Sequence, residues 1–587
     1  MKVRVIGGVA VVALVAYAVV SAVRPVPFAP AADVPRGALV YLQIEDLPAF
    51  MRLWNESGFK DKYLQSQNFG DLSKRHLGMK IASLWQEFSD ALGMPIDTDF
   101  VSSLAANRAA VAVYDIGKLD MVFIAPMNAT TFEATRLMQG ADKFDSEQLD
   151  DGTQIYRVDV NADKGRQRQQ VLFAHVRDRL IVATNEKLLA QTVSIITGRL
   201  KNNALADGPA FSTLAAGTIP KTAAVWVDQT ALNSDYYFKR YWLMSNVGSL
   251  KNIRSGMFDL SISRGEIVED RRFLLKEPVA ATSVSLLDAK ELMSRVPDRA
   301  RYYKIERASP EAVNLALSSV LSFRRSSSDS AVSSTGGRYR DANCDDDDYG
   351  SDKFEKYINE TDEEAVAVSA RDDNSVDVSA SIASAGPRAV LSLARSRAEQ
   401  APLFIDIDKA VVMTLSSPAA FDRTGFEKTI SEALATRLLI SGQKLDAQWV
   451  TKSDKGISWR ELEVPVLAWG VRYTLQGDQL VVSNEGAFLS AILGTHGSSL
   501  NFTSEQYSDI TVLRPPDISG DFQSTFERLA PAKDDFFVGN ILSLVNSAPT
   551  VEKIEKTRSF QGNLMRERLS VILKTNGSPA EKTTESE

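Results

Sequence analysis

The chain has 587 residues, of which 44% are hydrophobic and 24% charged, a composition typical of globular proteins. This length exceeds one ordinary hydrophobic core and predicts two or more domains, while a net charge of −8 argues against a nucleic-acid binder. The single cysteine, Cys344, excludes an intramolecular disulfide, a cysteine-rich zinc site and CxxC redox chemistry.

An uncharged apolar run covers residues 5–23 and follows Lys2 and Arg4. Nineteen residues in a helix span about the thickness of a bilayer's hydrocarbon core, and positive charges before the run favour a cytoplasmic N-terminus. We therefore predict that residues 1–32 are an anchor and linker, with the rest of the chain outside the inner (cytoplasmic) membrane. A cleaved signal peptide is the alternative, because residues 29–31 have the small-x-small form of a cleavage site.

Strand-like segments dominate the chain after the anchor. They alternate or run apolar and are rich in β-branched residues. The predicted strands are residues 39–44, 109–113, 121–125, 154–160, 171–176, 180–183, 257–263 and 267–276, and the predicted helices are residues 130–139 and 187–197. Because short turns join neighbouring strands, we predict an α+β fold, with a mainly antiparallel sheet and helices on one face.

An internal repeat is the strongest structural signal in the sequence. Thr130-Thr131-Phe132-Glu133 is matched by Thr424-Gly425-Phe426-Glu427, and both segments fit the capping-box pattern. Further matches, which keep the same order at separations of 294 to 304 residues, pair Gly152, Tyr156-Arg157, Arg177 and Asn185-Glu186 with Gly456, Trp459-Arg460, Arg472 and Asn484-Glu485. For Arg177 with Glu186, and for Arg472 with Glu485, we expect structural roles. Two divergent copies of one domain are predicted.

The first copy is assigned to residues 33–280 and the second to residues 281–574. Val34-Pro35 precedes the first strand of one, and Val296-Pro297 precedes a strand at residues 301–305 in the other. The second copy contains an acidic, Ser/Asp-rich insertion at residues 324–364, which predicts a mobile loop. Two strand-like segments at residues 365–370 and 375–380 have no counterpart in the first copy, and residues 575–587 are predicted to be a disordered tail.

The acidic insertion contains the only candidate metal ligands. Asp345 and Asp347 have the spacing of the first and third ligands of an EF-hand loop, with Gly350 at the sixth position. Lys356 stands where that loop needs a bidentate glutamate. A solvated acidic loop is therefore the favoured interpretation, and a weak calcium or magnesium contact is the alternative.

A cluster of aromatic residues is the other candidate site. Tyr236, Tyr237, Tyr241 and Trp242 lie close together with Lys239 and Arg240 between them. Core packing is the favoured interpretation, and a contact with a partner or a lipid interface is the alternative.

Groups suited to catalysis are scarce. The three histidines, His76, His175 and His496, do not have the spacing of metal ligands, and no nucleophile elbow or phosphate-binding loop occurs. We predict no catalytic residue and no cofactor.

The N-terminal anchor, the opening at residues 34–41, the strand at 109–113 and the strand-to-helix junction at 180–186 together resemble an uncharacterised bacterial family of membrane-anchored extracytoplasmic proteins. The resemblance covers most of residues 34–276 and, more weakly, the second half. It implies an outward-facing protein, and it transfers no catalytic residue because none is established for that group.

These observations predict a non-catalytic envelope protein, a binding or scaffolding module that contacts other envelope proteins. Linked copies of one domain raise the effective concentration for a shared partner. A carrier or sensor of an apolar ligand such as lipid is the first alternative, and a hydrolase with an unrecognised site is the second.

Overall fold

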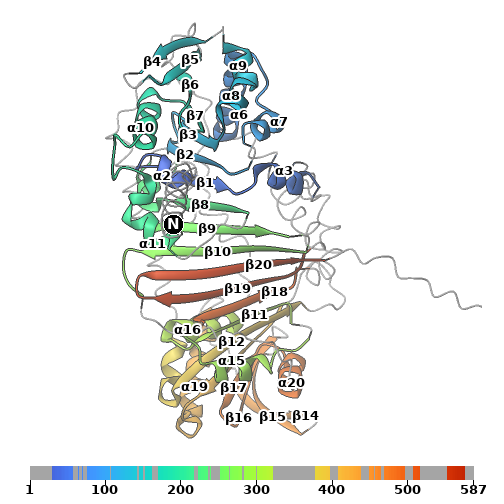
Figure 1. Ribbon diagram of the computed structural model, residues 1–587. Coiled ribbons are helices and arrows are strands. Elements are labelled where there is room, and N and C mark those ends of the chain that lie inside the picture. Colours follow the sequence, from blue (N-terminus) through green and yellow to red (C-terminus); the bar gives the residue numbers. More distant parts are fainter. Residues whose placement is uncertain are drawn as a thin grey trace, which may run out of the picture. The chain divides into compact units, whose positions relative to one another are not determined.

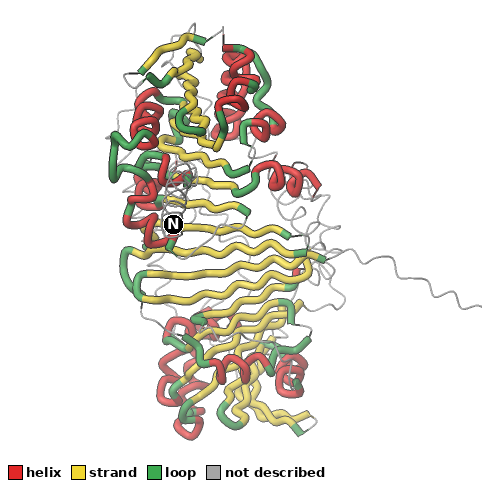
Figure 2. Tube along the Cα trace, viewed as in Figure 1, coloured by secondary structure: helices red, strands yellow, loops and turns green. Residues whose placement is uncertain are grey.

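A computed structural model describes residues 29–56, 64, 69, 76–105, 107–141, 144–149, 152–160, 169–216, 222–235, 238, 252–263, 265–279, 283–298, 300–321, 377–396, 407–437, 448–454, 456–464, 469–495, 507–515 and 551–574. The chain divides into two compact units, residues 1–278 with 563–565 and residues 279–562 with 566–587. Each unit combines helices with an antiparallel sheet (Figure 2), so the predicted α+β class is confirmed.

Ten strands of the first unit pair in one antiparallel order within the described residues. That order is β4 (Asp145–Gln148), β5 (Gln154–Val160), β6 (Gln169–His175), β7 (Arg179–Ala183), β3 (Asp120–Pro126), β2 (Ala109–Asp115), β1 (Val40–Ile44), β8 (Ala223–Val227), β9 (Ile253–Ile262) and β10 (Glu266–Leu275). Each predicted strand of this half overlaps one of these elements, although residues 39, 176, 263 and 276 lie outside them.

Helices cover both faces of the first unit's sheet, which corrects the prediction of helices on one face (Figure 1). One face packs α10 (Glu186–Ile196) and α11 (Pro209–Ala215), next to α2 (Pro30–Asp33) and η2 (Leu205–Asp207). The short helix α12 (Gln229–Ser234) lies against β9. The other face packs α3 (Leu47–Glu56), α6 (His76–Leu92), α7 (Thr98–Ser103), α8 (Ala129–Glu133) and α9 (Arg136–Gln139). Leu172 of β6 packs on the face that carries α10 and α11, and Phe173 packs on the face that carries α6 to α9, because consecutive residues of a strand point to opposite sides.

The second unit has ten strands in its described part as well. Their order is β14 (Gln448–Asp454), β15 (Ile457–Val464), β16 (Trp469–Gln476), β17 (Gln479–Ser483), β13 (Ile407–Leu415), β12 (Pro387–Ser396), β11 (Tyr302–Arg307), β18 (Asp509–Leu513), β19 (Val551–Gln561) and β20 (Leu564–Leu573). One face packs α15 (Leu286–Met293) and α20 (Gly486–Gly494). The other packs α16 (Pro310–Leu321), η3 (Val378–Ala385) and α19 (Arg423–Arg437), with η4 (Pro418–Ala420) next to η3.

Counted from the edge strands β4 and β14, the chain connects the strands of the two units in the same order. In the first unit β7 lies between β6 and β3, and in the second β17 lies between β16 and β13. The central tyrosines behave alike: Tyr41 of β1 is directly opposite Ala112 and Trp226, and Tyr303 of β11 is directly opposite Leu393 and Val512. Both tyrosines are almost completely buried.

Three local predictions are wrong. The helix predicted at residues 130–139 is two short helices, because Thr135 caps the second one by accepting a hydrogen bond from Met138 N. The N-cap of α8 is Asn128 rather than Thr130, and Asp422 rather than Thr424 accepts the hydrogen bond from Gly425 N at the start of α19. Residues 378–380, predicted as strand, begin the 3₁₀ helix η3, whose start is capped by Asp377.

The predicted anchor at residues 5–23 lies outside the described residues, as do the acidic insertion at 324–364 and the tail at 575–587. No helix among the residues that the structure describes has the length and apolar character needed to cross a membrane.

Candidate functional site

The sequence-predicted candidate residues all lie outside the described part of the chain. These are the aromatic residues Tyr236, Tyr237, Tyr241 and Trp242 and the possible metal ligands Asp345 and Asp347. The described residues instead reveal two clusters of charged side chains in the second unit, one around the buried Glu461 and one around the half-buried Glu427. Both lie on strands β15 and β16, one on each face of the sheet.

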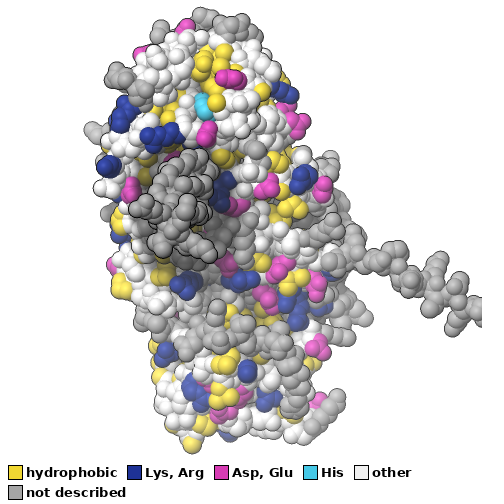
Figure 3. Space-filling model, viewed as in Figure 1, with side chains coloured by type: hydrophobic (Ala, Val, Ile, Leu, Met, Phe, Trp, Pro, Cys, Tyr) yellow, Lys and Arg dark blue, Asp and Glu magenta, His cyan; other side chains and the backbone are white. Residues whose placement is uncertain are grey.

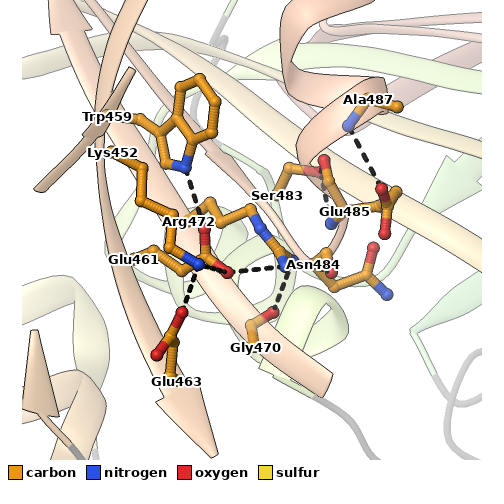
Figure 4. Close-up of polar contacts among 10 residues, drawn as sticks. All are labelled: Lys452, Trp459, Glu461, Glu463, Gly470, Arg472, Ser483, Asn484, Glu485 and Ala487. Atoms are coloured by element: carbon orange, nitrogen blue, oxygen red, sulfur yellow. Dashed lines mark hydrogen bonds and ion pairs between the residues drawn. The ribbon is translucent and has the colours of Figure 1, made fainter. Parts of the chain in front are cut away.

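The first cluster, which we call the Glu461 cluster, is built by strand register (Figure 4). Lys452 of β14 lies directly opposite Trp459 of β15, and Glu461 of β15 lies directly opposite Arg472 of β16. Because residues two apart on a strand share a face, all four side chains lie on the face that carries α20.

Glu461 is 5% exposed and accepts hydrogen bonds through both carboxylate oxygens. Trp459 Nε1 donates to Oε2 at 3.0 Å, and Arg472 Nη2 donates to Oε1 at 2.8 Å. Lys452 Nζ lies 3.4 Å from Oε1 and also forms an ion pair with Glu463. The carboxylate is thus surrounded by donors from all three strands.

Arg472 connects this cluster to the start of α20. Its Nη1 donates to Asn484 O at 2.8 Å. A Cβ atom on Gly486 would lie 3.4 Å from Arg472 Nε, so the guanidinium group packs close to the first residue of the helix. Glu485 caps that helix by accepting a hydrogen bond from Ala487 N at 3.2 Å.

The second cluster, the Glu427 cluster, lies under α19 on the opposite face. Arg460 binds the Glu427 carboxylate through two hydrogen bonds, at 2.8 and 3.1 Å. Tyr473 donates its hydroxyl hydrogen to Glu427 Oε1 at 2.7 Å, and Trp449 Nε1 donates to Glu427 O at 3.2 Å. Phe426 and Tyr473 form an edge-to-face pair with ring centroids 5.0 Å apart.

Both carboxylates are held in their ionised form. Burial alone would raise the pKa of Glu427, but the hydrogen bonds from Arg460 and Tyr473 outweigh it, and the pKa lies below its usual value. Burial also favours a higher pKa for Glu461. The hydrogen bond from Trp459 and the positive charge of Arg472 outweigh this effect, so the pKa of Glu461 is lowered as well. Burial, and then the adjacent Glu427, raise the pKa of the Tyr473 hydroxyl well above its ordinary value.

These shifts have a chemical consequence. A general acid or base works best with a pKa near the operating pH, and these carboxylates and this phenol are moved away from neutrality. Their lone pairs and protons are already committed to partners within the fold. The arrangement suits a structural role, in which charged residues tie three strands and two helices together.

Histidine and metal chemistry have little support in the described part of the chain. His175 Nε2 lies 2.8 Å from Met127 O, and its ring stacks on Phe132 with centroids 5.0 Å apart. No group of three or more His, Cys, Asp or Glu residues with the geometry of a metal site occurs among the residues that the structure describes. His496 lies outside them.

The arginines and glutamates for which the repeat predicts structural roles, Arg177 with Glu186 and Arg472 with Glu485, form no ion pair with one another in the structure. Glu186 pairs with Arg157 at 2.9 Å, whereas Arg177 donates to the carbonyl oxygen of Ile196 at 2.8 Å. Arg472 pairs with Glu461 rather than with Glu485. Glu461 was not predicted from the sequence, and the local sequence carries no clear signal for it because polar and apolar residues do not alternate regularly in β15.

Comparison with known proteins assigns no family. No family model matches the chain, and no curated protein matches it. Among solved structures, crystal forms I, III and IV of TP0453 match with 10 to 11% identity and TM-scores of 0.23 to 0.24. Each match covers 46% of this chain and 85 to 88% of TP0453. Likenesses at this level carry no argument about fold or function.

Proposed function

We propose that this chain is a membrane-anchored envelope protein that acts as a non-catalytic binding or scaffolding module, built from two divergent copies of one antiparallel-sheet domain. The observation that carries the proposal is the shared order of ten strands in the two units. A domain that is repeated whole presents two related surfaces, and linking them strengthens binding to a partner that engages both.

Strand registers support the duplication in detail. The β6–β7 hairpin turns through residues 177–178, and the β16–β17 hairpin turns through residues 477–478. The helix that follows starts at Asn185 as N-cap in one unit and at Glu485 as N-cap in the other. Gly152 and Gly456 both have positive φ, 84° and 83°, in the turn before the second strand of each order.

The same registers correct the sequence alignment of the repeats. Tyr156 lies directly opposite Phe173, and Arg460 lies directly opposite Tyr473. Tyr156 therefore corresponds to Arg460 and not to Trp459, a shift of one residue that places Trp459 on the other face of the sheet. Arg177 corresponds to Gly477 in the hairpin turn, not to Arg472.

The hydrogen-bond partners of Glu427 and Glu461 support a non-catalytic role. Glu427 and Glu461 are each bound by several donors from the fold, and their pKa values are lowered rather than brought near neutrality. Unless a substrate displaces those donors, neither carboxylate is available for proton transfer.

The anchor is tested by fractionation and proteolysis. Full-length chain and a variant lacking residues 5–23 are expressed in cells, and membranes are extracted with alkaline carbonate. We expect the full chain to stay in the membrane pellet and to be digested by protease added to spheroplasts. Release of the full chain by carbonate, or protection of its body from protease alongside a digested exported control, contradicts the proposal.

The binding role is tested by cross-linking in intact cells. We expect one or a few envelope proteins to be cross-linked reproducibly, and expect Glu427→Gln and Glu461→Gln variants that remain folded to keep these cross-links. Loss of a measurable hydrolytic activity in those variants would instead identify an enzyme. A lipid that co-purifies at a fixed ratio, in the absence of cross-linked proteins, would favour the carrier of an apolar ligand.

A further inference from the structure

A group of basic side chains lies beside α2 in the first unit, close to the first residue that the structure describes. We call it the basic cluster, and its members are Arg36, Arg177, Arg199 and Lys201. All four are exposed. Figure 3 shows Lys and Arg side chains gathered on the surface over α10, the helix whose C-terminal end the cluster surrounds.

The cluster is held in place by hydrogen bonds to the loop that follows α10. Arg177 donates to Ile196 O at 2.8 Å and to Thr197 O at 3.2 Å. At the other end of the loop, Arg36 Nη2 donates to Asp207 O at 2.7 Å. Arg199 and Lys201 lie in the loop between these two contacts.

The positive charges of Arg36 and Arg177 are not neutralised by their hydrogen bonds. Their hydrogen-bond acceptors are backbone carbonyls, which orient a guanidinium without neutralising it, and among the described residues neither Arg36 nor Arg177 forms an ion pair. The nearest carboxylates in sequence are Asp33, Asp178 and Asp207, and Asp33 forms an ion pair with Arg179 at 2.9 Å, which cancels its charge. Asp207 accepts the Ala204 amide as a helix cap. Four positive side chains therefore stand against two negative ones, and the surface is positive.

The basic cluster lies close to the start of the first unit, which follows the predicted membrane anchor after a short stretch of chain. Pro35 forms a β-bridge with Ala204, and Leu205 N donates to Val34 O at 2.9 Å, so the loop lies against the start of the unit. Only residues 24–28 separate the apolar run from the described chain. At full extension five residues reach about 18 Å, which keeps the start of the first unit near the bilayer surface.

We propose that the basic cluster rests on the phosphate head groups of anionic lipids and fixes the orientation of the first unit on the membrane. This inference depends on the proposed anchor at residues 5–23. Basic residues next to a membrane-spanning segment are attracted to anionic lipid within about one Debye length of the surface. Fully extended, the tether is about twice the Debye length of about 8 to 10 Å, so the cluster can approach the lipid surface to within that length.

Lysine acylation on the intact protein tests the orientation. Full-length chain is reconstituted in nanodiscs of zwitterionic lipid, or of the same lipid with anionic phosphatidylglycerol, and treated with an uncharged N-hydroxysuccinimide ester. Mass spectrometry then gives the acylation rate of each lysine. Lys187, exposed at the opposite end of α10, is the internal control.

We expect anionic discs to slow acylation of Lys201 about five-fold or more relative to zwitterionic discs, with no comparable change at Lys187. One molar salt should abolish the difference. The double variant Arg36→Gln/Arg177→Gln should reduce it, whereas Arg136→Gln/Arg254→Gln, which removes two exposed basic residues elsewhere on the unit, should not.

Two failures are distinguishable. If the chain enters the discs but Lys201 reacts equally in both lipids, or Lys187 is slowed as much as Lys201, the anchor stands and the orientation by the basic cluster is wrong. If the chain does not remain with the discs at all, the anchor and the inference fall together.

Discussion

Arg460 donates two hydrogen bonds to Glu427, Nε to Oε1 at 2.8 Å and Nη2 to Oε2 at 3.1 Å, and so joins strand β15 to helix α19. Such a bidentate ion pair restrains both the position of the helix along the strand and its distance from the sheet, because both donors must reach both carboxylate oxygens. In the first unit the corresponding position holds Tyr156, which stacks on Phe173 with centroids 4.9 Å apart. One face of the sheet thus carries an aromatic stack in one unit and an ion pair in the other.

Removing the Glu427 carboxylate should destabilise the second unit. Glu427→Ala leaves Arg460 and the Tyr473 hydroxyl without their acceptor, and we expect a loss of about 2 kcal/mol in the free energy of unfolding, between the values typical of surface and buried pairs. Urea denaturation followed by tryptophan fluorescence measures it. Glu432→Ala, on an exposed position of the same helix, is the control and should change stability by less than about 0.5 kcal/mol. Equal effects of the two substitutions would show that the Glu427 cluster contributes nothing specific.

The second unit should lose stability in acid. The pKa values of Glu427 and Glu461 are lower in the folded protein than in the unfolded chain, so their stabilising contribution is complete above the unfolded value of about 4.3. It is lost as the pH falls through the lower, folded values. Protection factors of the β15 and β16 amides, which correct for the slower intrinsic hydrogen exchange in acid, should be lower at pH 3.5 than at pH 6. In the Glu427→Gln/Glu461→Gln variant that difference should shrink, and an unchanged difference would assign the acid effect to other groups.

Gly470 should not tolerate a side chain. A Cβ atom there would lie 2.8 Å from Leu462 O, a backbone atom of the neighbouring strand, so Gly470→Ala must displace β15 from β16. We expect a loss of about 1 to 3 kcal/mol, measured by thermal or urea unfolding. Gly494→Ala, at the end of α20 with no atom within 4 Å of the new Cβ, should be neutral or slightly stabilising. Unchanged stability of Gly470→Ala would mean that β15 and β16 can move apart at this position with little loss of free energy.

The two helix caps should behave as a matched pair. Asn185 accepts hydrogen bonds from Lys187 N at 3.0 Å and Leu188 N at 3.4 Å, and Glu485 accepts one from Ala487 N at 3.2 Å. Replacing either with alanine leaves helix amides without an acceptor, and we expect each to cost about 1 kcal/mol. Hydrogen exchange should become faster in α10 for Asn185→Ala and in α20 for Glu485→Ala. An effect in one helix only would show that the two positions are not equivalent in energy.

Much of the local structure was predictable from the sequence. The strand at Gln154–Val160 and the helix ending before Gly198 were located from alternation and from a turn residue, because these signals depend on near neighbours in the chain. The matched glycines Gly152 and Gly456 both have positive φ angles in the structure. Backbone conformations that favour glycine leave a mark in the sequence itself.

Tertiary structure alone decided which residues meet. Glu461 and Arg472 come together because β15 and β16 pair in one particular register, and a shift of a single residue would turn Arg472 to the opposite face. Helices on both faces of each sheet, like the contact of Glu427 with Arg460, depend on packing between segments far apart in the chain. The alternation of side chains along a strand determines which residues share a face. The neighbouring strand and its register determine what each face contacts, and the local sequence pattern does not specify that neighbour.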